Sequence, residues 1–323
     1  MNCQARYAQR WGHLHNPHVR ALAWLIDAPD LLDAAAPEWR GRLAAPIVVT
    51  PAIAHWLAQL DAAPAPLLSA LAARPRQRLG LYAEQLMGFF YAAQQRLVAH
   101  GVQVRASRND TVGEFDFLLE IDGVDGVDGV DGVEHIELAT KFYLLATGKR
   151  VASRFDTLIG PNLADSLGAK MRKILDKQLT LGAHPAAQAL LARPVLRARA
   201  LVKGWLFYPQ AMAGMAGMDG INGAHCRGFW CALADAATLP GFASMRWVLL
   251  PRLQWLAPYR LQAGVETFDG AGLVAALGAL LAVSPAPLLV AALQASANGE
   301  MVEAARGFIV PDDWQARAAA RPT

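Results

Sequence analysis

The chain has 323 residues, of which 54% are hydrophobic and 18% are charged, and its formal net charge is +3. This composition excludes an intrinsically disordered chain and supplies enough apolar residues for a sizeable core. No apolar run approaches the ~18 residues of a membrane span, the first residues lack an apolar signal region, and three cysteines are too few for a disulfide framework, so we expect a cytoplasmic protein without a membrane segment.

Residues 1–75 predict a helical N-terminal extension made of short helices that are separated by prolines. The next segment, RLGLYAEQLMGFFYAAQQRLVAHG (78–101), predicts a long amphipathic helix that ends at Gly101. Glu84 lies beside the apolar stripe of this helix. Since burying an unpaired carboxylate is costly, Glu84 is a candidate functional residue.

Three strands are predicted to follow, over residues 102–107, 114–121 and 134–145. Alternation places Glu114 and Asp116 on one face of the second strand. On the third strand, Glu137, Ala139 and Lys141 point in the same direction.

A perfect D-G-V repeat joins the second strand to the third. It lacks the ligand spacing of an EF-hand calcium loop, which uses positions 1, 3, 5 and 12. We interpret the repeat as an expanded hairpin loop, because lengthening a loop costs only about 0.6 kcal/mol per doubling. The two flanking strands are therefore predicted to pair antiparallel.

Residues 164–179 predict a helix with Asp165 at its start and a basic end, and residues 199–209 predict a strand. The last third reads as short strands with turns, and 272–296 as two Ala/Leu helices. We therefore expect an α/β (α+β) protein with a helical N-terminal extension (1–75), a core (76–210) and a mixed C-terminal region packed on the core (211–323).

Basic residues are concentrated in the middle of the chain. Residues 141–203 contain 12 Lys and Arg against 3 Asp and Glu, a net charge of +9. Such a block indicates an anionic partner, although a solvated basic helix face is the alternative. The candidate nucleic-acid-binding residues are Lys149, Arg150, Arg154, Lys170, Lys173 and Lys177.

Four residues of the core form a candidate catalytic set: Glu84, Asp116, Glu137 and Lys141. Two carboxylates on adjacent antiparallel strands can hold one Mg²⁺ (or Mn²⁺), which prefers one or two carboxylates together with phosphate oxygens. A nearby lysine can position water or balance phosphate charge, and the helix carboxylate can complete the outer shell. The alternative is a set of structural ion pairs with no further role.

The stretches GLYAEQL, VGEFDFLLEI and HIELATKF resemble the PD-(D/E)XK nuclease superfamily, which has a restriction-endonuclease-like fold. The resemblance implies an αβββαβ core, Asp116 and Glu137 as metal ligands, and Glu84 as the helix acid. The chain departs from the pattern Glu-x-Lys, because Ala139 occupies the lysine position and Lys141 follows two residues later. Three alternatives follow: Lys141 reaches the phosphate through its long side chain, Lys170 or Gln178 on the next helix substitutes for it, or the site binds without cutting.

The chain as a whole resembles a bacterial family described as domain of unknown function 1853, through RLGLYAEQLMGFFY, GEFDFLL, HIELATKFYL, VKGWLFYP, RLQWLAP and VPDDW. This resemblance implies no activity. Three hypotheses therefore stay open: a magnesium-dependent nuclease acting on DNA more than on RNA, a catalytically decayed nucleic-acid-binding module, and a scaffold protein without a nucleic-acid role.

Overall fold

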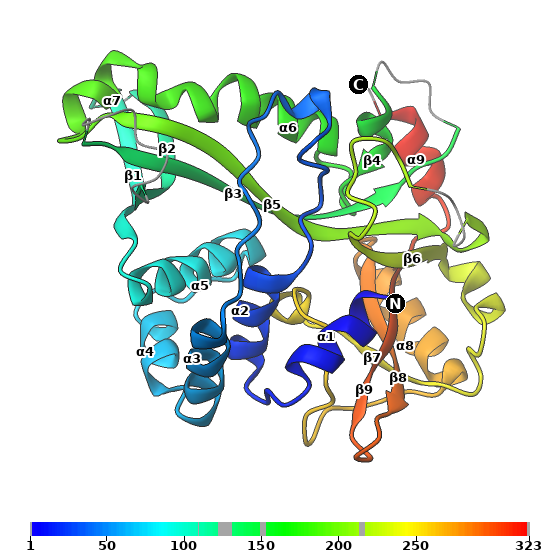
Figure 1. The fold of residues 1–323 in the computed structure, drawn as a ribbon. Helices are drawn as coiled ribbons and strands as arrows, with labels where there is room; N and C mark the ends of the chain where they lie inside the picture. The colour runs from blue at the N-terminus through cyan, green and yellow to red at the C-terminus, as the bar shows by residue number, and fades with distance from the viewer. Residues whose placement is uncertain (1, 109, 122–130, 149–152, 213–216, 322–323) are drawn as a thin grey trace.

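The computed structural model describes residues 2–108, 110–121, 131–148, 153–212 and 217–321. Within these residues nine strands form one sheet in the order β1-β2-β3-β5-β6-β9-β8-β7, and β4 pairs with β3 outside this path. β3, β5, β6 and β9 run parallel to one another, whereas both ends of the sheet are antiparallel. Helices cover both faces (Figure 1). The mixed α/β class is confirmed.

The N-terminal region is helical, as predicted. It contains α1 (Cys3–Trp11), α2 (Pro17–Asp27), the 3₁₀ turn η1 (Pro37–Trp39), α3 (Pro51–Ala62) and α4 (Ala65–Ala72). Side chains of Asn2, Asn16 and Thr50 accept hydrogen bonds from the first-turn N–H groups of α1, α2 and α3. These caps and the prolines at the helix starts fix where the short helices begin.

The core begins with α5 (Leu79–Ala93), β1 (Leu97–Ser107), β2 (Asp110–Glu120) and β3 (Val133–Leu145). The predicted helix end at Gly101 is wrong. Gln95 adopts a left-handed backbone conformation with φ 56°, which ends the helix, and the chain from Leu97 onward gains hydrogen bonds to β2 instead. The antiparallel pairing of β2 with β3 is confirmed by the register Phe117↔Ile136. Most of the D-G-V repeat, residues 122–130, lies outside the described residues.

The second half of the core contains η2 (Arg154–Thr157), β4 (Leu158–Ile159), α6 (Leu167–Asp176), η3 (Gln178–Ala183), α7 (Pro185–Leu190) and β5 (Val195–Pro209). The predicted helix over 164–179 is shorter at both ends. The Ser166 side chain accepts a hydrogen bond from the N–H of Ala169 and starts α6 there, which leaves Asp165 outside the helix. The order helix, three strands, helix, strand is present as α5, β1, β2, β3, α6 and β5.

The C-terminal region continues the same sheet with η4 (Gln210–Met212), β6 (Cys226–Ala232), η5 (Leu233–Thr238), β7 (Arg246–Leu249), η6 (Arg252–Gln254), α8 (Gly270–Val283), β8 (Leu288–Ala295), β9 (Met301–Val310) and α9 (Trp314–Ala320). The prediction of two helices over 272–296 is wrong in its second half. Pro285 and Pro287 cannot extend a helix, and the following residues pair with β7 and β9. The division of the chain into three regions stays a prediction.

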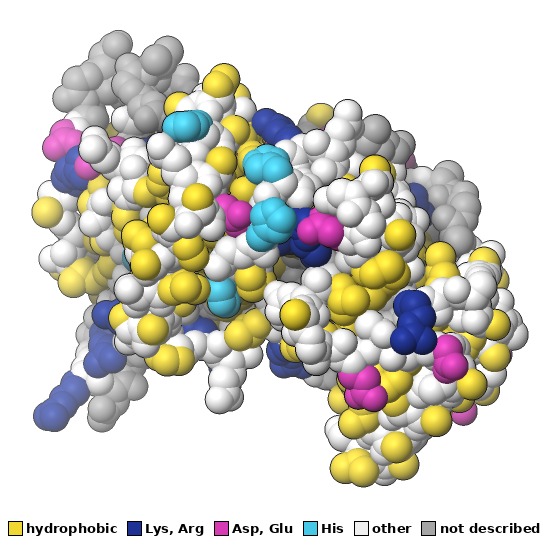
Figure 2. Space-filling model, turned by 90° about the horizontal axis from the view of Figure 1, so that it is seen from below, with side chains coloured by type: hydrophobic (Ala, Val, Ile, Leu, Met, Phe, Trp, Pro, Cys, Tyr) yellow, Lys and Arg dark blue, Asp and Glu magenta, His cyan; other side chains and the backbone are white. Residues whose placement is uncertain are grey.

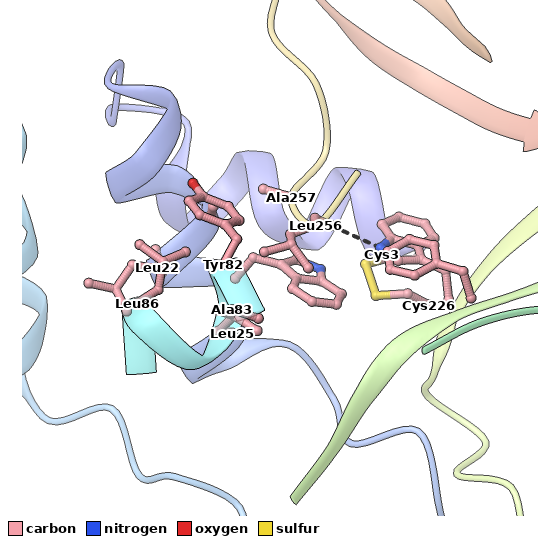
Figure 3. Packing of buried hydrophobic residues seen from close by; sticks show 14 of the residues in the cluster. Cys3, Leu22, Leu25, Tyr82, Ala83, Leu86, Cys226, Leu256 and Ala257 are labelled. Carbon is pink, nitrogen blue, oxygen red and sulfur yellow. Dashed lines mark hydrogen bonds between the residues drawn. A yellow bond between two sulfur atoms is a disulfide. The ribbon is translucent and has the colours of Figure 1, made fainter. Parts of the chain in front are cut away.

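A large apolar cluster joins the N-terminal helices to α5 and to the middle of the sheet (Figure 3). Within it Trp24 of α2 stacks on Trp205 of β5 with ring centroids 6.3 Å apart. A disulfide joins Cys3 of α1 to Cys226 of β6, and Cys231 is a buried free thiol. Disulfides are rare in reducing compartments. The cysteines therefore give no support to the expected cytoplasmic location.

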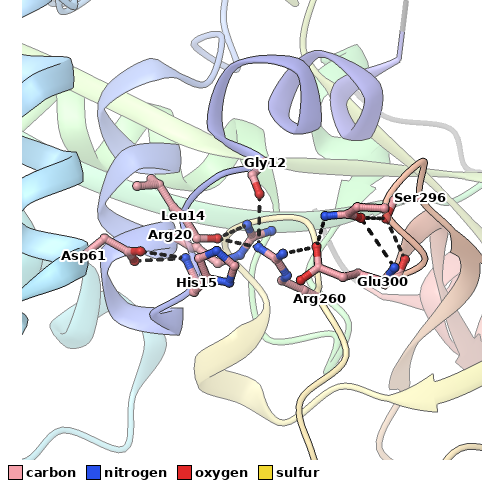
Figure 4. Close-up of polar contacts among 9 residues, drawn as sticks. Gly12, Leu14, His15, Arg20, Asp61, Arg260, Ser296 and Glu300 are labelled. Carbon is pink, nitrogen blue, oxygen red and sulfur yellow. Dashed lines mark hydrogen bonds and ion pairs between the residues drawn. The ribbon is translucent and has the colours of Figure 1, made fainter.

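A polar network ties α2 to the C-terminal region (Figure 4). The Arg260 guanidinium donates to the carbonyl oxygens of Gly12 and Leu14, at 3.1 and 2.9 Å, and pairs with Glu300. Arg20 donates to the carbonyl oxygens of Leu14 and Pro258, at 3.0 and 2.9 Å. Arg20, Arg260 and Glu300 are among the residues that line a cavity of about 210 Å³. In the described part of the chain, no helix is both long and apolar enough to cross a membrane.

Candidate active site

The candidate site lies where β2 and β3 separate. Their pairing ends at Phe117↔Ile136, while β3 continues beside β5 as far as Leu144. We call this point the strand fork. The backbone of β3 beyond Ile136 therefore lacks β2 as a hydrogen-bonding neighbour, and side chains can fill that place.

Asp116 fills the first position of the strand fork. Its Oδ2 accepts a hydrogen bond of 2.9 Å from the N–H of Leu138, a group that the departing strand no longer satisfies. The residues beside it do not keep the predicted alternation: Phe115 joins an apolar cluster with Leu181 of η3, and Phe117 joins the cluster on the α5 face. The Asp116 carboxylate is thereby fixed between the two strands, where it also interacts with the side chain of Glu137.

Glu137 is the most enclosed acid of the site, with a side chain 2% exposed. Its Oε1 accepts a hydrogen bond from the Gln178 amide and lies 3.7 Å from Lys170 Nζ, which itself donates to Gln178 Oε1 at 3.2 Å. Its Oε2 is buried without a hydrogen-bond donor and lies 3.8 Å from His135 Nε2. Half of this carboxylate is therefore satisfied from α6 and η3, and half is not.

Glu84 reaches the same site from α5, on the opposite face of the sheet from α6 (Figure 1). Gly80, one turn earlier, lies against the side chain of Thr140 on β3, so the first half of α5 packs at the strand fork. The charge of Asp116 raises the pKa of Glu84, which indicates that the two carboxylates are close enough to interact. The structure thus brings Asp116 and Glu137 together at the strand fork and places Glu84 within electrostatic range of both.

The three acids hold their protons more tightly than isolated carboxyl groups do. Burial is the main cause in each case: it raises the pKa of Glu84 to about 7, that of Asp116 to about 6 and that of Glu137 to about 8. Repulsion from Asp116 raises the pKa of Glu137 further, while Lys170 opposes the rise in all three. Burial in turn lowers the pKa of Lys170. The site is short of positive charge.

Lys141 does not contact the acids. Its Nζ donates to Asp165 Oδ2 at 3.1 Å, and the Tyr143 hydroxyl donates to the same oxygen at 3.1 Å. Ala139, at the usual lysine position, is buried in the cluster beneath α6. Lys170 and Gln178, which the sequence offered as substitutes, are the residues that reach Glu137.

The other predicted nucleic-acid-binding residues are dispersed. Lys149 and Arg150 lie outside the described residues. Arg154 pairs with Glu38 and lies 3.6 Å from Asp219, and its guanidinium covers the Phe155 ring. Lys173 and Lys177 are exposed on α6 and at its end. Of the four predicted residues that the structure describes, Lys170 alone contacts one of the acids, Glu137.

The predicted metal ligands, Asp116 and Glu137, both lie at the strand fork. Mg²⁺ and Mn²⁺ prefer oxygen ligands, and Glu137 Oε2 is a buried oxygen without a hydrogen-bond donor. Across the described residues, no group of three or more His, Cys, Asp or Glu side chains is arranged to hold a metal ion. The predicted metal ligands, Asp116 and Glu137, are only two side chains.

Histidines gather on another face of the molecule, seen in Figure 2 beside acidic and basic side chains. Two histidines of the N-terminal region have local partners: His18 Nδ1 lies 2.7 Å from the Tyr82 hydroxyl, and the His13 ring lies 6.1 Å from that of Trp11. These contacts are typical of packing, so the acids at the strand fork remain the better candidate site.

The family described as domain of unknown function (DUF1853) matches residues 20–310. The chain therefore belongs to this family. No curated protein and no solved structure gives a significant match.

Proposed function

We propose that this member of the DUF1853 family is a divalent-metal-dependent nuclease with a PD-(D/E)XK-like core, acting on phosphodiester bonds of DNA. One observation carries the proposal: Asp116 and Glu137 lie at the strand fork with Lys170 Nζ 3.7 Å from Glu137 Oε1, and Glu84 of α5 interacts electrostatically with both acids. Clusters of like charge that are partly removed from water are costly to fold, and they occur preferentially at functional sites.

The chemistry of the cluster supports a phosphate substrate with a metal ion. Asp116 and Glu137 would hold Mg²⁺ or Mn²⁺, which would supply positive charge to the phosphate oxygens. Glu84 would accept hydrogen bonds from water bound to that metal. Lys170, held by Glu137 and Gln178, is placed to donate to a phosphate oxygen or to orient the attacking water.

Binding without cleavage is the second candidate, and one observation favours it. The lysine position of the PD-(D/E)XK pattern is the buried Ala139, and Lys141 is engaged with Asp165. In this alternative Lys170 balances the charge of Glu137 and takes no part in a reaction. The two candidates predict the same binding of nucleic acid and a different yield of product.

The test combines metal binding with cleavage. Purified protein is incubated with duplex, single-stranded and four-way-junction DNA in Mg²⁺ or Mn²⁺, and metal binding is followed by calorimetry. We expect Asp116→Asn, which keeps an acceptor for the Leu138 N–H, to lose cleavage by at least ~100-fold, the scale on which removal of a charge-stabilising group acts. It should also lose metal binding.

The control is Glu120→Gln. Glu120 lies on the same strand as Asp116 but pairs with Arg193, at 2.8 Å, and takes no part in the site. The activity of this variant should equal that of the wild type. Metal binding without any product from the wild-type protein would favour the binding module. Absence of both metal binding and nucleic-acid binding at about 50 mM salt would reject both candidates and leave a scaffold protein.

A further inference from the structure

Three arginines lie close together just before α5. Arg74, Arg76 and Arg78 alternate with Pro75 and Gln77 in the connection from α4, a stretch we call the arginine segment (residues 74–78). None of the three guanidinium groups pairs with a carboxylate among the described residues. Arg76 is half-buried and its Nε has no acceptor, whereas Arg74 and Arg78 are exposed.

The fold holds the arginine segment next to the candidate site. The Gln85 side chain, one residue after Glu84, donates to the carbonyl oxygen of Arg74 at 2.8 Å. At the other end Arg78 is the N-cap residue of α5, and its carbonyl accepts a hydrogen bond from the N–H of Tyr82 at 3.0 Å. Both ends of the segment are therefore fixed on the helix that carries Glu84. In agreement, the charge of Arg76 lowers the pKa of Glu84.

A second group of cations lies on the other side of the acids. Lys170 of α6 contacts Glu137, and Lys173 is exposed one turn further along the same helix. Since α5 and α6 cover opposite faces of the sheet (Figure 1), the carboxylates of the strand fork lie between two basic groups. A chain of closely spaced anions can contact both groups at once, whereas a single small anion cannot.

We infer that the arginine segment and the exposed lysines of α6 bind the phosphates on either side of the one held at the strand fork, so that a nucleic-acid strand crosses the fork from α5 to α6. This inference rests on the proposed function for the identity of the central site. It adds the direction of the strand and three contact residues, Arg74, Arg76 and Arg78. Such contacts fix position on the backbone and do not read sequence.

The experiment measures the salt dependence of binding. A fluorescein-labelled DNA, as duplex and as single strand, is titrated with protein in EDTA at 50–300 mM salt, and binding is read by fluorescence anisotropy. Each lost phosphate contact lowers the slope of log K against log salt by about 0.9 for a duplex and about 0.7 for a single strand. The variant Arg74→Gln/Arg76→Gln/Arg78→Gln should therefore lower the slope by two to three in magnitude and weaken binding at least tenfold at 50 mM salt.

The matched control is Arg6→Gln/Arg246→Gln/Arg317→Gln, which removes the same charge from α1, β7 and α9 and should leave the slope nearly unchanged. Equal loss in both triple variants would show general attraction and would overturn the inference, as would an unchanged slope in the first variant. Four of the six substituted side chains are exposed and one in each variant, Arg76 or Arg6, is half-buried, so both variants should keep a similar unfolding midpoint in urea.

The outcome is separable from that of the proposed function. If the arginine variant changes the slope and the wild-type protein yields no product, the strand path is supported and cleavage is rejected. If Asp116→Asn loses cleavage and the arginine variant keeps the wild-type slope, the nuclease is supported and the proposed path of the nucleic-acid strand is overturned. Calorimetry should find the same Mg²⁺ binding in the arginine variant as in the wild type.

Discussion

Replacing Glu137 by glutamine is expected to stabilise the metal-free protein at alkaline pH. The side chain is 2% exposed, one carboxylate oxygen has no donor, and burial together with the charge of Asp116 raises its pKa from 4.5 to about 8. A group that binds its proton more tightly in the folded state makes the free energy of unfolding fall as pH rises. The loss begins near pH 4.5 and is complete above about pH 8.

The magnitude follows from the width of that window. One pKa unit corresponds to about 1.4 kcal/mol, so the whole interval sets an upper limit of about 5 kcal/mol. The charge is shared with Asp116 and Glu84, and glutamine weakens the charge-assisted contacts with Lys170 and Gln178 by about 1 kcal/mol each. We therefore expect Glu137→Gln to gain about 2 kcal/mol at pH 9 and almost nothing at pH 5, where both side chains are neutral.

Urea unfolding followed by the fluorescence of the nine tryptophans measures this difference at the two pH values. Comparing the variant with the wild type at each pH cancels the titration of other groups, such as His135, whose pKa burial lowers to about 4. Addition of Mg²⁺ at pH 8 should raise the free energy of unfolding of the wild type and not that of the variant. Glu120→Gln is the control, and because its arginine partner lowers the pKa of Glu120, it should be slightly destabilised by at most about 1 kcal/mol.

The opposite sign would refute this reasoning. If Glu137→Gln loses stability by several kcal/mol at pH 9, then Glu137 and Lys170 form a structural ion pair whose disruption leaves a buried charge. The acids of the strand fork would then contribute to folding, and the argument for a functional site would fail.

Two further predictions concern the rest of the fold. Arg306→Leu should lower the free energy of unfolding by about 3–5 kcal/mol in urea titration, because Arg306 and its partner Glu303 are both fully buried and the variant leaves the carboxylate without its cation; a loss below 1 kcal/mol would contradict this. Thiol titration of the unfolded, non-reduced protein should detect one free thiol, that of Cys231, and three after reduction; three thiols before reduction would show that the bond between α1 and β6 does not form.

The sequence indicates the three acids as candidates because each signal is local. Asp116 and Glu137 interrupt strands whose neighbours are apolar, and Glu84 does the same on a helix, so burial makes each of them conspicuous. Their convergence also follows from the element order, which requires the second and third strands to pair. The lysine could not be predicted in this way, because Lys141 and Lys170 are equally basic in sequence and only the packing of α6 decides which one reaches Glu137.

The missed features depend on contacts between distant segments. The residues from Leu97 onward form a strand, and do not extend α5, because they pair with β2. Residues 288–295 form a strand because they pair with β7 and β9. The arginine segment had a visible signal, three arginines at alternate positions, but it lies in a part of the chain (1–140) with 16 acidic and 11 basic residues. A net charge summed over such a long stretch conceals a short basic one.

The position of Lys170 explains how the chain can depart from the Glu-x-Lys pattern and keep a cation at the site. A lysine at position 139 would have to enter the apolar cluster beneath α6, where Ala139 packs. Supplied from α6, the ammonium group reaches Glu137 from the solvent side without displacing that cluster, and Gln178 holds it by a hydrogen bond of 3.2 Å. The cation's distance from Glu137 is then set by the packing of α6 and no longer by the register of β3. The proposed activity therefore depends on α6, and a pattern confined to the strand cannot decide whether the protein cleaves nucleic acid.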